Sequence, residues 1–411
     1  MGSRGKRATF EDARRWLAEF LPRAGSTYTA ERNYDLGDVA RNNVSCLSPF
    51  VRHGLLYEEE VIRAVLDRHS SDQARKFIEE VCWRTYFKGW LELRAEVWRR
   101  YRDELRRTMA LCDEDSDLDR RCHEAIEGRT GIDCFDHWAR ELIATNYLHN
   151  HARMWFASIW IFTLRLPWVL GADFFLRHLL DGDAASNTLS WRWVGGLHTR
   201  GKIYLATSPN ITKFSGGRFP RTEGLTTEAV ALREAPLPAA QPLEILLSPE
   251  PDRPTGLLIT DDDCQGGRVL HETSLTPCAC AGVICADERS PLPVAASVRR
   301  FTEEALRDGL ARTSDRYVVP TALVTPSQIP AWAEAHGLRQ IVMRYVPQGP
   351  SRDVLCGIRP ELEARGIRMV EVRRAWDEAF WPHCNAGYFS VKKRIPSVLR
   401  GSGIPCQRIR W

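Results

Sequence analysis

The sequence predicts an all-helical domain followed by a smaller domain built on a parallel β-sheet. Between residues 10 and 205, apolar residues recur three or four positions apart, which is the spacing of amphipathic helices. After a stretch rich in Pro, Ser, Thr and Gly, short β-rich runs alternate with helical stretches, an order typical of parallel sheets. The predicted fold class is therefore α plus α/β, with a helical domain over 1–220, a linker over 221–253 and a Rossmann-like α/β domain over 254–411.

The helical pattern is clearest in five segments. Apolar residues at helical spacing occupy residues 10–21, 58–69, 74–107, 135–143 and 151–164. The most apolar run, "MWFASIWIFTL", is shorter than the roughly 20 residues that a membrane-spanning helix needs. We therefore expect a buried core helix there and no membrane association. The strands are expected at "TGLLIT", "AGVICA", "YVVPTALVT", "RQIVMRY" and "IRMVEV".

Composition indicates a folded intracellular protein. Of the 411 residues, 44% are hydrophobic and 27% are charged, which is enough apolar material for a full core and excludes wholesale disorder. The net charge of +4 permits a nucleic-acid partner without arguing for one. Twelve cysteines without a signal peptide indicate reduced thiols, and Cys278 and Cys280 have no second pair with which to bind zinc. We expect a cytoplasmic monomer without a metal.

Three of the predicted helices carry polar or aromatic clusters at core-like positions. Burying one unpartnered polar group costs roughly 2–7 kcal/mol, so each cluster either faces water, satisfies itself or meets a ligand. Taken together the clusters favour a large, polar, buried ligand. Ser45 and Ser48 precede Pro49 at a helix start whose N–H groups can hold phosphate, which favours a phosphorylated heterocycle. The clusters are Asp183, Asn187 and Trp191; Asn150, Arg153 and Met154; and Glu80, Trp83 and Arg84.

Five motifs, in order, resemble those of the DNA photolyases and cryptochromes. "VSCLSPFVRHG" is similar to the flavin-phosphate loop of that family, and "EEVCWRTYF" is similar to its Glu-x-x-Trp-Arg helix. "EGRTGIDCFD", "YLHNHARM" and "DGDAASNTLSWRW" follow at similar separations, so the resemblance covers about residues 28–205. The resemblance implies a flavin-binding fold with a bound FAD.

The resemblance also implies roles around FAD. Arg153 would pair with Asp181 against the isoalloxazine and balance the charge of reduced, anionic FAD, while Asn187 would face flavin N5. Family cryptochromes usually carry Asp or Cys at that position, so Asn187 favours repair. The complete set of implied cofactor-binding residues is Tyr28, Ser45, Leu47, Ser48, Arg84, Asn150, Arg153, Asp181, Asp183 and Asn187.

The implied substrate is DNA damaged by cyclobutane pyrimidine dimers. The family's pocket for that lesion holds a Glu, an Asn, a Met and two Trp, which match Glu80, Asn150, Met154, Trp83 and Trp193. The two tryptophans would sandwich the flipped-out lesion, and Glu80 would stabilise the radical anion that forms on electron transfer. The implied catalytic residues are Glu80, Asn187, Trp191 and Trp168, the last two for photoreduction.

The sequence departs from the family at three places, and one further feature leaves two interpretations open. Ala125 stands where the third tryptophan of the photoreduction chain is expected, and His151 stands where an Arg is common. The α/β domain follows the helical domain instead of preceding it, which predicts a circularly permuted order. Asp261–Asp263 end the first predicted strand, where either an antenna chromophore of unknown identity or a plain acidic turn is expected.

Two further alternatives concern function and DNA contact. A cryptochrome-like blue-light photoreceptor that binds FAD without repair is the alternative function, and a relative that binds no flavin is the third. The arginines from Arg84 to Arg107 alternate with acidic residues, which favours a solvated helix face over a DNA-binding stripe. The basic segments "SRGKR" and "VKKR" are expected to add nonspecific DNA affinity.

Overall fold

The chain forms two compact units, and each unit combines segments that are not continuous in sequence. The computed structural model describes residues 6–220 and 222–405. The first unit contains Ser26–Val44 and Arg94–Ala239, and the second contains Lys6–Gly25, Ser45–Leu93 and the chain from residue 240 onward. The predicted domains are continuous stretches of sequence, with residues 1–220 in one helical domain. In the structure, the residues before 94 are divided between the two units.

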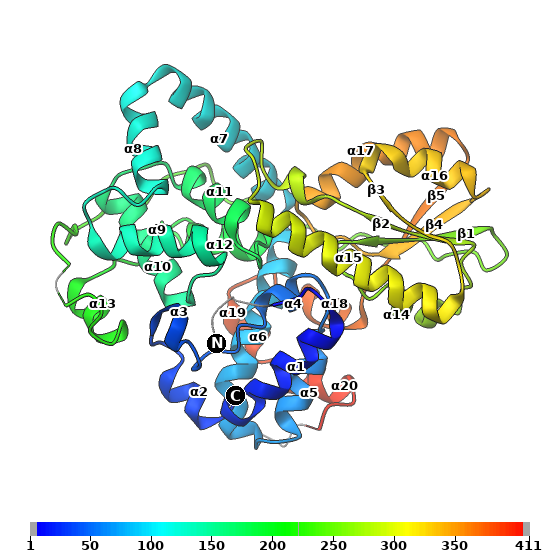
Figure 1. The fold of residues 1–411 in the computed structure, drawn as a ribbon, viewed down its shortest axis with the longest axis horizontal. Coiled ribbons are helices and arrows are strands. Elements are labelled where there is room, and N and C mark those ends of the chain that lie inside the picture. Colours follow the sequence, from blue (N-terminus) through cyan, green and yellow to red (C-terminus); the bar gives the residue numbers. More distant parts are fainter. Residues whose placement is uncertain (1–5, 221, 406–411) are drawn as a thin grey trace. The chain divides into compact units, whose positions relative to one another are not determined.

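The first unit is helical, as Figure 1 shows for each of its elements. The helices α7 and α8 contact each other, and the side chain of Asp115 between them caps α8 by accepting from the backbone N–H groups of Asp117 and Leu118. Helices α10 and α11 both contact α12. The helices are α2 (Ser26–Glu31), α3 (Gly37–Ala40), α7 (Ala95–Glu114), α8 (Ser116–Ile126), α9 (Asp133–Thr145), α10 (Asn150–Ser158), α11 (Trp168–His178), α12 (Ala184–Val194) and α13 (Ser208–Phe214).

Two of the predicted helical segments are interrupted. The segment 74–107 divides into α6 (Ser71–Glu92) and α7, because Arg94 adopts φ −142° and ψ 54° and so leaves the helical region. The segment 151–164 begins as α10 and changes to a π-helix, η2 (Ile159–Thr163), in which Leu164 N–H donates to the Ile159 carbonyl. Periodicity alone does not show either change, since the apolar spacing continues through both.

The second unit contains the predicted parallel sheet. All five strands are parallel, in the order β3-β2-β1-β4-β5. The chain adds β2 and β3 on one side of β1 and then β4 and β5 on the other side, so the strand order switches between β1 and β4. This is a doubly wound arrangement, and it confirms the predicted α/β class. The strands are β1 (Thr255–Thr260), β2 (Ala279–Val283), β3 (Thr321–Val324), β4 (Gln340–Arg344) and β5 (Arg368–Val372).

Helices cover both faces of the sheet (Figure 1). One face packs its apolar side chains, such as Leu258 and Ile341, against α16 (Ile329–Ala335) and α17 (Pro350–Ala364). The other face contacts α14 (Gly266–Thr273) and α15 (Ala296–Tyr317). Strands that are buried on both sides need apolar residues at nearly every position, which is why these runs are continuous and not alternating.

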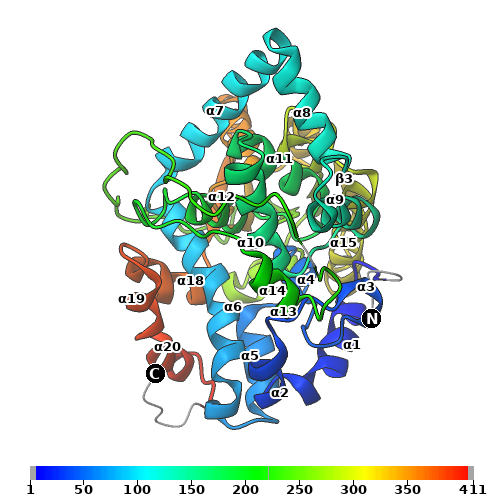
Figure 2. The same cartoon turned by 90° about the vertical axis from the view of Figure 1, so that its left-hand side faces the viewer.

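Helices from both ends of the sequence complete the second unit. The early helices are α1 (Phe10–Phe20), α4 (Ser48–Arg52), α5 (Glu58–Leu66) and α6, and the late ones are α18 (Ala375–Phe380), α19 (Tyr388–Lys392) and α20 (Ile395–Gly401). Helices α18 and α19 contact α6, as Figure 2 shows. Gly89 of α6 permits the close approach of Trp381, which directly follows α18, since a Cβ at position 89 would lie 2.6 Å from Cδ1 of Trp381.

The predicted linker has no regular structure in its described part. Residues 222–254 form neither helix nor strand. Leu232 N–H donates to the Gly195 carbonyl in the first unit, and Gln241 N–H donates to the Leu93 carbonyl in the second. Among the described helices, none combines the length and the apolar character that a membrane span requires.

Candidate functional site

The predicted flavin pair, Arg153 and Asp181, forms an ion pair in the first unit. Nη2 of Arg153 donates to both carboxylate oxygens of Asp181, at 3.0 and 2.9 Å, and Nε donates to the Leu148 carbonyl. The Asp181 side chain is 5% exposed and the Arg153 side chain 23%. No bond forms between Nη1 of Arg153 and any described residue. This atom therefore stays available to a ligand, while Asp181 fixes the orientation of the guanidinium.

Helix α12 begins at Asp183 and carries Asn187 and Trp191. The Asp183 carboxylate accepts from Ser186 N–H and so caps the helix. The amide of Asn187 donates to the Ala172 carbonyl of α11 at 2.7 Å, which holds the side chain in one orientation. The indole of Trp191 packs edge-on against Trp160, with ring centroids 6.2 Å apart.

Four polar side-chain atoms on α12 are buried without a hydrogen-bond partner among the described residues. They are Oγ of Ser186, Oγ1 of Thr188, Nε1 of Trp191 and Nε of Arg192. Buried polar groups in proteins are nearly always paired, so an unpaired group calls for a partner outside the chain. Four such atoms on one helix favour a polar ligand beside α12.

Trp193, one of the predicted lesion-stacking residues, has a neighbour that the sequence did not indicate. Its ring stacks on Tyr204 with centroids 5.6 Å apart, and the Tyr204 hydroxyl lies 3.3 Å from Nε2 of His151. Nδ1 of His151 lies 3.0 Å from the Asn33 carbonyl, so both ring nitrogens have partners within this unit. Burial lowers the pKa of His151, which favours a neutral ring and removes the cationic phosphate contact expected of an arginine. Asn150 is exposed at the start of α10, and Met154 is half-buried one turn later.

Trp168 lies at the start of α11 and is partly exposed. Its ring contacts Tyr101 at 5.7 Å, and Tyr101 stacks on Trp98 at 5.2 Å. Ala125, at the expected third tryptophan position, is fully buried on α8. The aromatic neighbours of Trp168 therefore come from α7 and not from α8.

The predicted phosphate loop lies in the second unit. Cys46 adopts φ +51°, which produces a tight turn, and Oγ of Ser45 accepts from Leu47 N–H at 3.4 Å. Ser48 then opens the five-residue helix α4. Nζ of Lys6 donates to the Cys46 carbonyl and brings a positive charge to the loop, a contact that the sequence did not indicate.

Glu80, Trp83 and Arg84 lie on α6 of the second unit, and all three are half-buried. The Trp83 ring stacks on Tyr388 of α19, with centroids 3.8 Å apart and 12° between the planes. The Tyr388 hydroxyl donates to the Glu79 carbonyl at 2.7 Å and holds the ring in place. Tyr388 is thus a site neighbour that sequence reasoning missed, because it follows Trp83 by about three-quarters of the chain length.

The predicted site residues therefore fall into two sets. The first unit brings together Arg153 and Asp181 by a direct ion pair and places Asp183, Asn187 and Trp191 on one helix. It also contains Tyr28 on α2, together with Asn150, Met154, Trp168 and Trp193. The second unit contains Ser45, Leu47, Ser48, Glu80, Trp83 and Arg84.

Comparison with known proteins adds to this geometry. Residues 77–215 match the model of the FAD binding domain of DNA photolyase. This region is thus similar to the DNA photolyase family. A deoxyribodipyrimidine photo-lyase of Thermus thermophilus is 35% identical over 194 residues, which cover 47% of this chain and 43% of the relative. One from Streptomyces griseus is 32% identical over 183 residues, which cover 44% and 38%.

A crystal structure of a bacterial class III photolyase from Agrobacterium tumefaciens is 27% identical, with a TM-score of 0.42 over 51% of this chain and 43% of that one. The chain thus matches less than half the length of these curated photo-lyases.

The residues of the photolyase-like region fit a bound FAD. The donor set contains a guanidinium oriented by a carboxylate, a fixed amide and the four unpartnered polar atoms of α12. A flavin ring offers carbonyl oxygens and nitrogens that such groups recognise. Arg153, Asp181, Asp183 and Asn187 are the residues of this unit that would hold it.

Side chains of the chain itself occupy the carboxyl end of β1, where open α/β sheets bind ligands. Asp261 is fully buried, and Arg52 of α4 donates to both its carbonyl and its carboxylate, at 2.8 and 3.1 Å. The Ser351 hydroxyl donates to the same carboxylate, and Asp263 accepts from the Tyr57 hydroxyl. Neither Asp261 nor Asp263 thus forms an exposed acidic turn.

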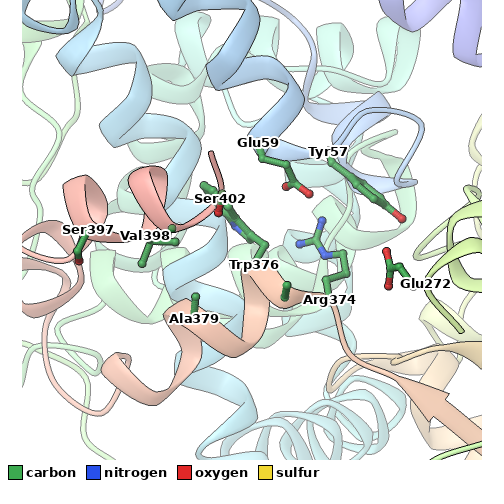
Figure 3. A pocket seen from close by; sticks show the side chains of 11 residues that line it. Tyr57, Glu59, Glu272, Arg374, Trp376, Ala379, Ser397, Val398 and Ser402 are labelled. Carbon is green, nitrogen blue, oxygen red and sulfur yellow. The ribbon is translucent and has the colours of Figure 1, made fainter. Parts of the chain in front are cut away.

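A cavity of about 500 Å³ in the second unit is lined by none of the predicted site residues. Figure 3 shows the carboxyl of Glu59 above the guanidinium of Arg374 in this cavity. Arg374 is paired with Glu58 and Asp377. Oε2 of Glu59 has no hydrogen-bond partner among the described residues, and burial raises the pKa of Glu59 to about 7.

Proposed function

We propose that the protein repairs cyclobutane pyrimidine dimers in DNA by light-driven electron transfer from reduced FAD. The observation that carries this proposal is α12, whose buried polar atoms lack protein partners within a region that matches the FAD binding domain of DNA photolyase. The curated relatives are named deoxyribodipyrimidine photo-lyases, which supports the same reaction for this chain.

The residues of the first unit would hold the flavin and set its charge. Arg153 presents Nη1 to the ring while Asp181 keeps the guanidinium in place, so a positive charge faces a reduced, anionic flavin. Asn187 would meet N5 with a neutral amide, which adds no repulsion. Reduced FAD, when bound, supplies the electron on absorbing blue light. Tyr28, Ser45, Leu47 and Ser48 would bind its phosphates, and Arg84 and Asn150 would also contact it.

The predicted lesion-binding residues come from both sets. Trp83 and Trp193 would stack on the flipped-out dimer, with Asn150 and Met154 shaping the pocket. A proton held on the carboxyl of Glu80 would stabilise the charge that develops on the thymine carbonyl. Trp191 and Trp168 would carry electrons during photoreduction. The circularly permuted order, an antenna chromophore, the monomeric state and the cytoplasmic location stay predictions.

The decisive experiment is repair of a cyclobutane thymine dimer in a short oligonucleotide by the photoreduced protein, with a dark control. Light-dependent recovery of intact thymines is expected. Glu80→Ala should lower the repair yield while the FAD content stays unchanged, because the proposed role of Glu80 is towards the lesion. Absence of repair by protein shown to carry fully reduced FAD would exclude the proposal, and loss of FAD from Glu80→Ala would show that its role is misassigned.

A cryptochrome-like photoreceptor is the second candidate, and one observation favours it. Trp83 already stacks on Tyr388, and Trp193 already stacks on Tyr204, so the rings proposed to clasp the lesion each have an aromatic neighbour. A receptor would keep FAD but would not bind a dimer more tightly than undamaged DNA. Comparing the affinities of one oligonucleotide with and without the lesion distinguishes the two functions.

A further inference from the structure

A cleft of about 440 Å³ in the second unit has a strongly basic lining. None of the residues that line it is acidic. Lys393 and Arg394 are both exposed there, and neither forms an ion pair with any residue that the structure describes. The lining residues are His383, Asn385, Ser390, Lys393 and Arg394.

The unpaired state of these two cations contrasts with the pairing of exposed arginines on α7. On α7 the exposed arginines are neutralised one turn away, as in the pairs of Arg106 with Asp103 and Arg107 with Glu104. Lys392, the residue before Lys393, is paired with Glu79 at 2.8 Å. The positive charge of Lys393 and Arg394 is thus left for a partner outside the described chain.

The groups of the cleft suit an oxyanion. Lys393 offers a compact ammonium and Arg394 a planar fork of donors, both of which bind phosphate oxygens. Burial and the Arg394 charge lower the pKa of His383, so its ring stays neutral and offers one N–H. The Ser390 hydroxyl already donates its proton to the Gly387 carbonyl, so it is not counted among the donors for the oxyanion.

An exposed aromatic ring stands on the adjacent helix. Phe389 of α19 is 77% exposed, whereas its neighbour Tyr388 is buried against Trp83. Among the large apolar side chains exposed in the described residues, Phe389 is the one aromatic ring. A basic cleft beside an exposed aromatic ring is the combination that binds single-stranded nucleic acid, because the cations hold phosphates and the ring stacks on a base.

We propose that the cleft of Lys393 and Arg394 binds a backbone phosphate of single-stranded DNA while Phe389 stacks on a neighbouring base. The proposal rests on the proposed function in taking DNA as the partner. It goes further by placing a strand contact on the segment that follows Trp381. It requires neither flavin nor a lesion.

The test measures binding of a fluorescent oligothymidylate to the full chain in the dark, which separates it from the repair assay. The double variant Lys393→Gln and Arg394→Gln should bind the oligothymidylate at least fivefold more weakly. The slope of log affinity against log salt concentration should also decrease by about 0.7 for each phosphate that is no longer neutralised. Phe389→Leu should weaken binding to the single strand at least threefold and leave duplex binding unchanged. Arg106→Gln is the matched control, because that exposed arginine is already paired with Asp103. The affinity of this variant for the oligothymidylate should stay within twofold of that of the parent protein.

Two outcomes would overturn the proposal. Unchanged affinity and salt slope in the double variant would show that the cleft contacts no phosphate. If 10 mM inorganic phosphate displaced the oligonucleotide at constant ionic strength, the cleft would be a site for a free anion instead. Thermal unfolding of each variant checks the fold, which these exposed positions should leave intact.

Discussion

Tyr388 lies flat on Trp83, with ring centroids 3.8 Å apart, and its hydroxyl donates to the Glu79 carbonyl. This contact fixes the plane of the tryptophan that we propose to stack on the lesion. A ring that is held in one orientation loses less conformational freedom when a base stacks on it.

Substitution of Tyr388 should show both the packing and the positioning effect. Tyr388→Phe removes only the hydrogen bond and should lower the free energy of unfolding by about 1 kcal/mol. Tyr388→Ala removes the ring and should cost about 3–5 kcal/mol, as well as weakening binding to the dimer. Denaturant titrations measure both values. Phe389→Ala is the adjacent control and should change stability by less than about 0.5 kcal/mol, since its side chain is exposed.

The ion pair of Arg153 and Asp181 should control flavin retention. Asp181→Asn leaves the guanidinium without its anchoring charge, so we expect FAD affinity to fall at least tenfold, or about 1.4 kcal/mol. Absorbance of the purified protein and fluorescence of released FAD measure this. Arg106→Ala breaks an exposed pair and should leave FAD content unchanged. Equal retention by Asp181→Asn and the parent protein would contradict the assigned role.

Asn187→Asp should make the reduced flavin harder to maintain. A carboxylate at this buried position would repel an anionic flavin and would also cease to donate to the Ala172 carbonyl. We expect the reduction potential of bound FAD to fall on the order of 60 mV, a tenfold change for one electron. Spectroelectrochemical titration measures it, and a potential equal to that of the parent would show that Asn187 lies away from the ring.

Gly171→Ala should displace Trp191. A Cβ on Gly171 would lie 2.3 Å from Cη2 of Trp191 and 2.9 Å from Cε2 of Trp160. Overpacking of this kind costs typically about 1–3 kcal/mol, and the moved indole should slow light-driven flavin reduction. Gly357→Ala is the matched control, because that helical glycine has open space and alanine should stabilise the helix by about 0.5–1 kcal/mol. Unaltered photoreduction in Gly171→Ala would remove Trp191 from the electron path.

Glu59 should make stability depend on pH. Burial raises its pKa from 4.5 to about 7 in the folded chain, so the folded state holds a proton that the unfolded state releases above pH 4.5. The stabilisation is complete below pH 4.5 and is lost as the pH rises through 7. Glu59→Gln should therefore raise the free energy of unfolding at pH 8, on the order of 1–3 kcal/mol, and change little at pH 4.5.

Urea unfolding at the two pH values checks this prediction. Glu60→Gln is the contrasting control, because Glu60 pairs with Arg268 and accepts from Tyr57 N–H. It should lose stability at pH 8. If Glu59→Gln also lost stability at pH 8, Glu59 would be a charged carboxylate with hydrogen-bond partners in the folded chain.

Local sequence patterns predicted the helices and strands well, but they could not predict contacts between residues that are far apart in the sequence. Strands such as β1 (255–260) follow from continuous β-rich runs, because burial on both faces leaves a signal within a few residues. No such signal links α6 to α18, although Nε1 of Trp376 donates to Oγ1 of Thr85 from 291 residues away. The stacking of Tyr388 on Trp83 is equally remote. The flavin motifs were visible as ordered residue types, whereas their aromatic neighbours depend on folded distances.

The bond between Arg52 and Asp261 has a consequence for biosynthesis. The two residues are 209 positions apart, and a ribosome adding about 5–20 residues per second takes roughly 10–40 s to cover that distance. During this interval helices α4 to α6 have left the exit tunnel, but the sheet that completes their unit does not yet exist. A nascent chain of this protein therefore exposes apolar helix faces until its last third is made, which makes it a natural client for chaperones that act during translation.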